Sequence, residues 1–209
     1  MKNVTDRTSN PFGFRPPFDR TGPDERTAVF GYGDANADFH VIGDHPGVHG
    51  GKRTGVPFTG ADAERLQDVF RAVGFASGPR DAPDLQNCYL SYLHMCALPN
   101  GHEPTADDYA ILERYFDAEL RAINAHILLP VGERATDHVL REYTTQRRKV
   151  DLEMAALHAT EIRGRGFLVV PVRDPADWTD DEYEAIVSRL EAILGRDYRQ
   201  TKGVATTVG

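Results

Sequence analysis

A carboxylate stands directly after the first strand-like run of the chain. The apolar run from Phe39 to Ile42 stops at Gly43, and Asp44 follows at once. Ligands of open α/β sheets bind at the carboxyl ends of the strands, so this acid is placed to act on a bound molecule. Such a carboxylate can position or activate water, or stabilise a cation. The structural alternative is that Asp44 only caps the turn that follows, as aspartate often does.

A segment rich in glycine and proline, residues 45–60, leads from this acid to a predicted helix that begins at Ala61. It reads HPGVHGGKRTGVPFTG. These residue types let the backbone turn tightly and come close to a ligand. Phe58, just before the helix, is placed to form a flat pocket wall, and an ordinary core phenylalanine is the alternative. The stretch from Asp38 to Gly60 is therefore the candidate site.

Several residues of this stretch are of types that bind metal ions. They are His40, Asp44, His45 and His49. Their spacing matches no recognised zinc motif, and a strand followed by a turn does not bring them together by itself. We predict no metal site, and keep a zinc-dependent small-molecule hydrolase only as a third reading of the function.

The composition is that of a single globular domain. The chain has 209 residues and a hydrophobic content of 40%, which is enough for one α/β core. No apolar run is long enough to span a bilayer, and the first residues lack a signal-peptide core. We therefore expect a cytoplasmic protein with no membrane partner. Cys88 and Cys96 are too few for a disulfide framework or for an iron–sulfur cluster, which usually takes four thiolates, so we expect buried thiols and no cofactor.

The charge balance is acidic. The formal charge is −8, from 24 basic and 32 acidic residues, which argues against a broad nucleic-acid surface. Only 4 of the basic residues are lysine, and 20 of the acids are aspartate, a balance that favours a halophilic source because an acidic surface stays soluble in concentrated salt. Phosphate contacts weaken in such a medium. The charge thus weakens DNA as a partner without excluding it.

The elements that must position these residues alternate along the chain. Core strands are predicted over 39–42, 86–95, 125–131 and 167–172, an edge strand over 27–32, and helices over 61–73, 105–124, 133–141 and 180–194. Thr105 is a plausible N-cap, and Ile111, Leu112, Phe116 and Leu120 lie on the apolar face of its helix. Residues 142–166 are polar and irregular. The pattern predicts an α/β fold, in which a four-stranded, mainly parallel sheet lies between helices as three α/β/α layers.

Three parts of the chain differ in composition. Residues 1–26 are rich in proline, arginine and aspartate, and are predicted to form an extended surface arm. Residues 27–195 form one predicted domain, and residues 196–209 a flexible tail. We expect a monomer.

Four segments carry motifs that are weak singly and more specific together. The first is GDHPG at 43–47, continued by GVPFTG at 55–60. The second is the strand at 89–96 with ALPN after it, and the third runs from Glu103 through HILLPVGE to Glu133. The fourth is VPVRDPA at 170–176. In this order they resemble the uracil-DNA glycosylase superfamily, most closely its family 4-like members, over residues 36–195.

The resemblance implies a fold, an activity and roles for the first motif. The strand order would be 2-1-3-4, with the site at the strand carboxyl ends. Such enzymes extrude uracil from the helix and cleave its N-glycosidic bond. Asp44 would handle water, and Phe58 would stack on the base. Backbone N–H groups in the loop Gly43-Asp44-His45-Pro46-Gly47, near His45 and Gly47, would bind a base oxygen.

This sequence also departs from the family's pattern. Tyr92 stands where many members place an asparagine that reads the uracil edge, and a tyrosine hydroxyl cannot copy the donor and acceptor of an amide. Asp174 replaces the histidine of the late motif, and an ionised carboxylate would repel a departing base anion. Only Cys96 matches a family 4 cluster position. The lack of the other cysteines supports the expectation that the protein binds no iron–sulfur cluster.

The leading hypothesis is therefore a glycosylase-like protein of base excision repair that hydrolyses uracil, or another deaminated base, from DNA. Asp44 and Asp174 are the catalytic candidates; Gly43, His45, Pro46, Gly47, Phe58, Tyr92 and Arg173 are the candidates for substrate binding. Arg173 belongs to a possible basic rim with Arg147, Arg148, Lys149, Arg163 and Arg165. Trp178 is read as an anchor of the last helix, with a wedge into the base stack as the alternative. The alternative function is a catalytically inactive member that binds nucleic acid or nucleotide.

Overall fold

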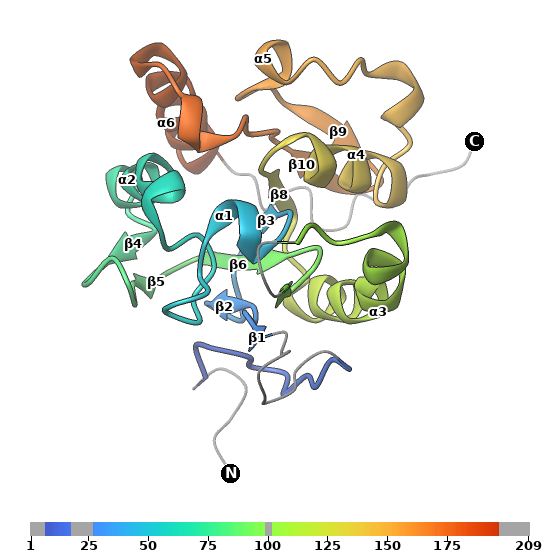
Figure 1. The fold of residues 1–209 in the computed structure, drawn as a ribbon. Helices are drawn as coiled ribbons and strands as arrows, with labels where there is room; N and C mark the ends of the chain where they lie inside the picture. The colour runs from blue at the N-terminus through green and yellow to red at the C-terminus, as the bar shows by residue number, and fades with distance from the viewer. Residues whose placement is uncertain (1–6, 18–26, 99–101, 197–209) are drawn as a thin grey trace.

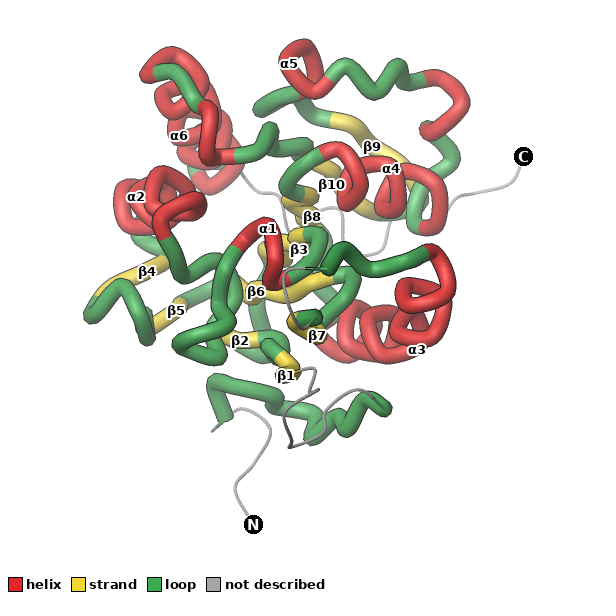
Figure 2. Tube along the Cα trace, viewed as in Figure 1, coloured by secondary structure: helices red, strands yellow, loops and turns green. Residues whose placement is uncertain are grey.

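The computed structural model describes residues 7–17, 27–98 and 102–196 (Figures 1 and 2). The remainder of the predicted arm and the tail from residue 197 lie outside the described residues. The strands are β1 (Thr27–Ala28), β2 (Tyr32–Gly33), β3 (Phe39–Gly43), β4 (Ala76–Ser77), β5 (Asp84–Leu85), β6 (Cys88–Tyr92), β7 (Cys96–Ala97), β8 (Ile127–Pro130), β9 (Ile162–Gly164) and β10 (Phe167–Val169). The α-helices are α1 (Pro46–His49), α2 (Glu64–Ala72), α3 (Ala106–Ile123), α4 (Glu133–Glu142), α5 (Met154–Leu157) and α6 (Asp180–Leu194), with 3-10 turns η2 (Ala61–Ala63), η4 (Arg147–Lys149) and η5 (Pro175–Asp177).

Four parallel strands form the centre of the sheet. β3 lies between β6 and β8, and β10 pairs with β8, which is the order 2-1-3-4 expected for the four predicted strands. Two short strands extend this centre at its edges, β2 antiparallel to β6 and β9 antiparallel to β10. The α/β fold class is confirmed, with six strands in the sheet rather than four. β9 lies within the segment that the sequence marked as irregular.

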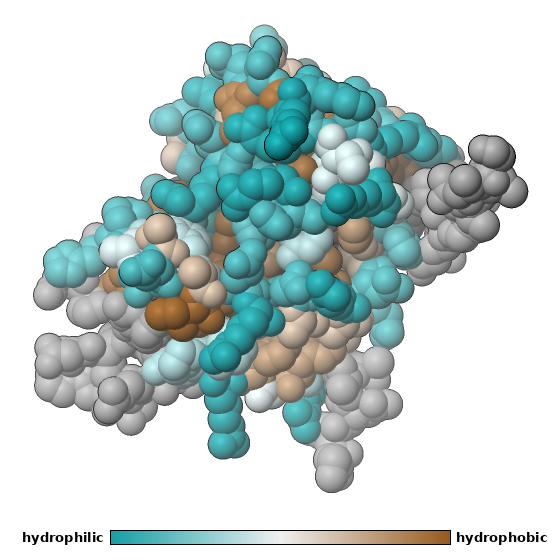
Figure 3. Space-filling model, turned by 90° about the vertical axis from the view of Figure 1, so that its right-hand side faces the viewer, coloured by the Kyte–Doolittle hydropathy of each residue, from teal (hydrophilic) through white to brown (hydrophobic). Residues whose placement is uncertain are grey.

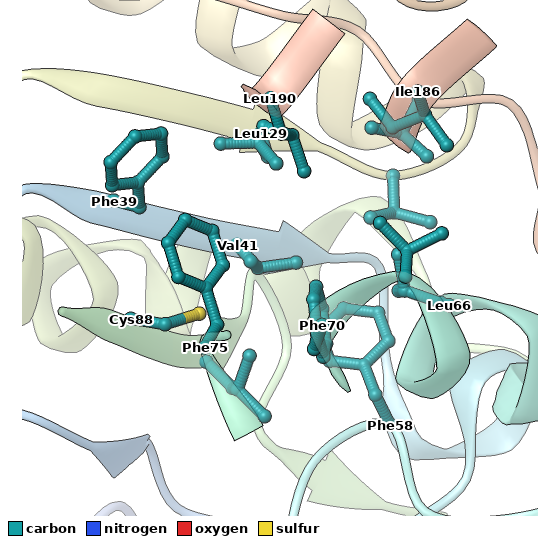
Figure 4. Packing of buried hydrophobic residues seen from close by; sticks show 14 of the residues in the cluster. Phe39, Val41, Phe58, Leu66, Phe70, Phe75, Cys88, Leu129, Ile186 and Leu190 are labelled. Atoms are coloured by element: carbon teal, nitrogen blue, oxygen red, sulfur yellow. The ribbon is translucent and has the colours of Figure 1, made fainter. Parts of the chain in front are cut away.

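Helices cover both faces of the sheet (Figure 1). Alternate side chains of the apolar strands point to opposite faces. Phe39 and Val41 of β3 therefore pack with α2 and α6, whereas Ile42 packs with α3 and α4. Figure 4 shows the first of these layers, in which Phe39, Val41 and Leu129 face Ile186 and Leu190 of α6. This is the three-layer arrangement that nearly continuous apolar strands favour.

Capping residues set the starts of the two longest helices. Thr105 caps α3, with Asp108 completing a capping box, and Thr179 and Glu182 do the same for α6. Each box satisfies backbone N–H groups that the first turn leaves without a partner. The predicted bounds of α6 match the observed ones. No helix among the described residues is both long and apolar enough to cross a membrane.

The buried face of α3 is rotated from the predicted one. Ile111, predicted to face the core, is 42% exposed, whereas Glu119 is 1% exposed. The buried line runs through Leu112, Phe116 and Glu119, which leaves residue 111 at its edge.

The surface around α3 and α4 is mostly hydrophilic, with small hydrophobic patches (Figure 3).

Glu119 occupies space that Gly31 leaves free. A Cβ atom at Gly31 would lie 2.2 Å from Glu119 Oε1. The same oxygen accepts a hydrogen bond of 2.8 Å from the hydroxyl of Tyr89, while Oε2 has no partner among the described residues. Burial raises the pKa of Glu119 to about 7, although the bond from Tyr89 opposes the shift.

This pKa predicts a loss of stability as pH rises. Glu119 binds its proton more tightly in the folded chain than in the unfolded chain, so its contribution is fully present below pH 4.5 and disappears as pH rises to about 7. The loss has an upper bound of about 3 kcal/mol. Glu119→Gln should gain stability relative to the wild type between pH 5 and pH 8 in urea unfolding. The exposed Glu113→Gln is the control, and equal pH slopes for all three proteins would contradict the prediction.

Candidate active site

The first turn after β3 is held by a histidine. His45 is the N-cap of α1, and its Nδ1 accepts a hydrogen bond of 3.0 Å from the N–H of Gly47. Its Nε2 lies 2.8 Å from Glu103 Oε2, which ties the turn to the segment before α3. Pro46 has no N–H. The amide of Gly47, expected to bind a base oxygen, is thus already bonded within the protein.

The glycine-rich loop after α1 folds back on itself. Gly50 and Gly51 have φ of 82° and 94°, and a Cβ atom there would lie 2.5 Å from Thr59 O and 2.7 Å from Val56 O. Only glycine fits both the backbone conformation and the space. The N–H of Gly51 also donates to Thr59 O at 2.9 Å. These contacts bring Phe58 against the end of α1.

Phe58 lies in the core, held at both its backbone polar groups. Its φ is +57°, an uncommon conformation for a bulky residue. The N–H of Phe58 donates to Tyr92 Oη at 2.7 Å, and its carbonyl accepts from Gln67 Nε2 at 2.8 Å. The ring is fully buried and packs beside Phe70 (Figure 4). The bonds to Tyr92 and Gln67 are what maintain the unfavourable backbone angle.

The hydroxyl of Tyr92 joins three segments. It accepts from Phe58 and donates to the carbonyl of His49 at 2.9 Å or of Gly50 at 3.1 Å. The side chain is 1% exposed. A Cβ atom at Gly43 would lie 2.7 Å from both the Phe58 and Tyr92 rings, which explains the glycine at the end of β3. The hydroxyl expected to contact the base therefore binds the protein's own backbone.

His49 is the site residue that the sequence did not single out by itself. Its ring packs against Phe58 in a tilted pair, with centroids 5.4 Å apart and planes at 31°, and stacks on the Tyr92 ring at 6.2 Å and 22°. Its Nδ1 accepts from the N–H of Asp44 at 3.2 Å, and its Nε2 lies 3.6 Å from Asp174 Oδ2. The only sequence signal was its place among four metal-binding residue types. Its role depends on contacts between distant segments.

Asp44 is bonded at both carboxylate oxygens. The hydroxyl of Tyr109 donates to Oδ1, and the Nε of Arg134 lies 3.3 Å from Oδ2. The guanidinium of Arg134 also lies 4.7 Å from the ring centroid of Tyr109, so the three groups form one cluster. Burial and the nearby carboxylate raise the pKa of Tyr109, which keeps the phenol proton that it donates.

Asp174 lines the same cavity as Asp44 and is the N-cap of η5. Its Oδ1 accepts from the N–H of Ala176 at 3.1 Å. The imidazole of His49, together with that N–H, lowers the pKa of Asp174 below its usual value, although partial burial opposes the shift. The carboxyl group is therefore ionised at neutral pH and offers no proton to a leaving base.

A cavity of about 600 Å³ brings these groups together. Its lining consists of Asp44, Val48, His49, Val131, Gly132, Glu133, Arg134, Asp137, Arg147, Leu152 and Asp174. Both acids chosen from the sequence line it. Phe58 and Tyr92 do not: His49, packed against both rings, forms the aromatic part of the wall. The slot expected between Asp44 and Phe58 is thus a cavity between Asp44, His49 and Asp174.

Arg173 points away from this cavity. Its Nη1 donates to Glu182 Oε1 of α6 at 2.6 Å, and its carbonyl accepts from Trp178 Nε1 at 2.9 Å. Trp178 is 4% exposed and packs edge-on against His158. The tryptophan anchors the start of α6, as the sequence favoured. Arg173 contributes to the same anchor rather than to the cavity wall.

The histidines of the first motif do not converge. His40 is buried on β3, where its Nε2 bonds Ser91 at 2.7 Å and burial lowers its pKa to about 3. The described part of the chain contains no group of three or more His, Cys, Asp or Glu side chains that could hold a metal ion. The zinc-hydrolase reading thus finds no ligand set there. Cys88 and Cys96 are both buried.

The hydroxyl of Tyr92 should be essential for the stability of the loop. Tyr92→Phe leaves the Phe58 N–H and an α1 carbonyl buried without a partner, a cost of about 1–3 kcal/mol. Tyr115→Phe is the control, because that hydroxyl is exposed and its hydrogen bond to Arg15 O is long, at 3.5 Å. Urea unfolding should separate the two variants. Equal midpoints would show that the Tyr92 hydroxyl does not hold the loop.

Comparison with known proteins places this site in a family. The model for the Uracil DNA glycosylase superfamily matches residues 30–190. The type-5 uracil-DNA glycosylase of Pyrobaculum aerophilum is 32% identical over 116 residues, which cover 53% of this chain and 51% of that protein. The type-5 enzyme of Thermus thermophilus is 31% identical over 121 residues, which cover 55% of each.

The alignments thus span about half the length of these curated relatives. The superfamily predicted from the motifs is confirmed, and the relatives are named type 5 rather than family 4. The family match covers β3, the glycine-rich loop and the strands that carry the cavity. This chain belongs to the uracil-DNA glycosylase superfamily.

Proposed function

We propose that the chain removes uracil, or another deaminated base, from DNA by hydrolysing the N-glycosidic bond, as a base excision repair enzyme would. The observation that carries the proposal is the placement of Asp44 on the wall of a cavity at the carboxyl ends of the parallel strands. Family membership supports it, as do the type-5 names of two relatives. The cavity is of a size that small ligands occupy.

The two carboxylates suit the charge that develops on the sugar. As the bond breaks, its electrons leave with the base and the sugar becomes a cation. Asp44 orients the water that attacks this cation, and Tyr109 and Arg134 fix the direction of its carboxylate. Asp174, which also lines the cavity and is ionised, stabilises the cation electrostatically. It does not replace the missing late-motif histidine as a donor to the base.

Arginine side chains at the cavity provide contacts for DNA phosphates. Arg134 and Arg147 line the cavity, and Arg134 is 58% exposed. Arg148 and Lys149 continue the basic run in η4. Phosphate contacts of this kind fix the position of the strand without reading its sequence. They give an acidic chain a local surface for DNA.

Substitution of Asp44 tests the proposed chemistry. Asp44→Asn keeps an acceptor for Tyr109 but removes the charge, and should slow release of uracil from an oligonucleotide about 100-fold in single turnover. Asp68→Asn on α2, which pairs with Arg80, is the control and should keep the wild-type rate. The assay is run in molar salt with uracil, hypoxanthine and xanthine substrates. A wild type that releases none of these bases would end the enzyme proposal.

The same assay identifies the second candidate, a member that binds nucleic acid without turnover. One observation favours it: both oxygens of Asp44 are already engaged, by Tyr109 and Arg134. Binding of a uracil-containing oligonucleotide by the wild type, with no base release, would select this alternative. Release that depends on Asp44 would reject it.

A further inference from the structure

His49 is a buried titratable group for which the chemistry proposed above has no use. Its side chain is 1% exposed, yet it lines the cavity between Asp44 and Asp174. It lies at the end of α1, where the turn to Gly50 fixes the direction of the chain. A histidine in this position has two ring nitrogens with different surroundings. The tautomer follows from the partners of those nitrogens.

The backbone determines which ring nitrogen carries the proton. The N–H of Asp44 donates to Nδ1 at 3.2 Å, so Nδ1 is the acceptor and Nε2 carries the hydrogen in the neutral ring. Nε2 has no hydrogen-bond partner among the described residues. It faces Asp174 Oδ2 at 3.6 Å, which is longer than a hydrogen bond but close enough for the imidazole to lower the pKa of that carboxyl group. A buried donor of this kind is costly unless something binds it.

Packing holds this donor in place. One face of the ring lies on Phe58, and the ring is nearly parallel to Tyr92. A Cβ atom at Gly132 would lie 3.9 Å from Nε2, an ordinary van der Waals distance, so Gly132 lies beside the edge of the ring that carries the donor. Phe58 and Tyr92 are themselves joined by the hydrogen bond from the Phe58 N–H. The Nε2–H bond therefore points in a fixed direction before any ligand arrives, as electrostatic catalysis requires.

The Asp174 side chain, which faces His49 Nε2, is exposed enough to change its position. The Asp174 side chain is 40% exposed, at the cap of a short turn. A carbonyl oxygen that approaches Nε2 can thus replace the carboxylate as the neighbour of the imidazole. The departing uracil carries its negative charge partly on such an oxygen.

We propose that His49 donates a hydrogen bond from Nε2 to the departing base, in the place of the late-motif histidine that this chain lacks. The inference rests on the proposed glycosylase function. The C1′–N bond breaks and both electrons leave with the base. The oxygen of water bonds to C1′ and loses a proton to Asp44 or solvent. His49 keeps its proton throughout, and the base anion then takes one from water.

The test varies both the donor and the leaving group. His49→Phe keeps a flat ring against Phe58 but removes the donor, and His49→Gln places an amide N–H near the position of Nε2. Single-turnover rates are measured on oligonucleotides that carry uracil or 5-fluorouracil. Fluorine withdraws electrons, so 5-fluorouracil leaves readily and needs the hydrogen bond less. Circular dichroism and thermal unfolding show whether each variant is folded.

His49→Phe should slow uracil release about 100-fold, the usual cost of one lost donor to a developing anion, and slow 5-fluorouracil release much less. His49→Gln should recover most of the uracil rate. Asp44→Asn is the matched control, because it acts on water and should slow both bases by the same factor. This difference between bases separates a donor from a ring that only supports the fold.

Equal losses on both bases in His49→Phe, or no loss on uracil, would overturn the inference alone. A folded His49→Gln variant as slow as His49→Phe on uracil would overturn it as well. A wild type that releases neither base would remove the proposed function, and the inference with it. The two failures are therefore distinguishable in a single set of assays.

Discussion

The geometry of the site depends on one phenolic hydroxyl. Tyr92, the last residue of β6, accepts a hydrogen bond from Phe58 and donates to the backbone at the end of α1. Tyr92 is 34 residues from Phe58 and 43 from His49, and its single hydroxyl bonds to the backbone of both. The hydroxyl positions His49 through the backbone and Phe58 through its amide. Because the groups are buried, an unsatisfied partner would cost far more than an exposed one.

This bond changes what the second strand contributes. A side chain at this place in the fold can read a base only if its polar atoms are free, and those of Tyr92 are not. The polar groups at the cavity come instead from the turn after β3, from the start of α4 and from η5. The strand end has become a support for the loop. The polar lining of the cavity is thus carried by turns and by the start of a helix rather than by the sheet itself.

The sequence was sufficient for the features that depend on local patterns. The four core strands and α6 follow from apolar periodicity, the start of α3 from its cap at Thr105, and the order of strands from the family resemblance. The acid after β3 was placed correctly at the strand ends, because that position follows from topology alone. β9 was missed since it is short and polar, and is stabilised by pairing with β10 rather than by a local pattern.

Side-chain contacts between distant segments could not be predicted from hydrophobic periodicity and motifs. Nothing in the local sequence shows that the Tyr92 hydroxyl has its partners 34 and 43 residues away. Nor does it show that His49 rather than Phe58 faces the cavity, or that Glu119 has room beside Gly31. These contacts depend on which segments the tertiary structure brings together, and local sequence does not determine that.

The borders of the sheet have a consequence for how copies of this protein meet. On one side, residues near Ser9 and Asn10 cover β2, and on the other β9 has only three residues and ends at Gly164. An uncovered, long and flat strand would invite another chain to extend the sheet by hydrogen bonding. Here few backbone groups are open to such an extension. The edges of the sheet therefore protect it from edge-to-edge aggregation with other chains in a crowded solution.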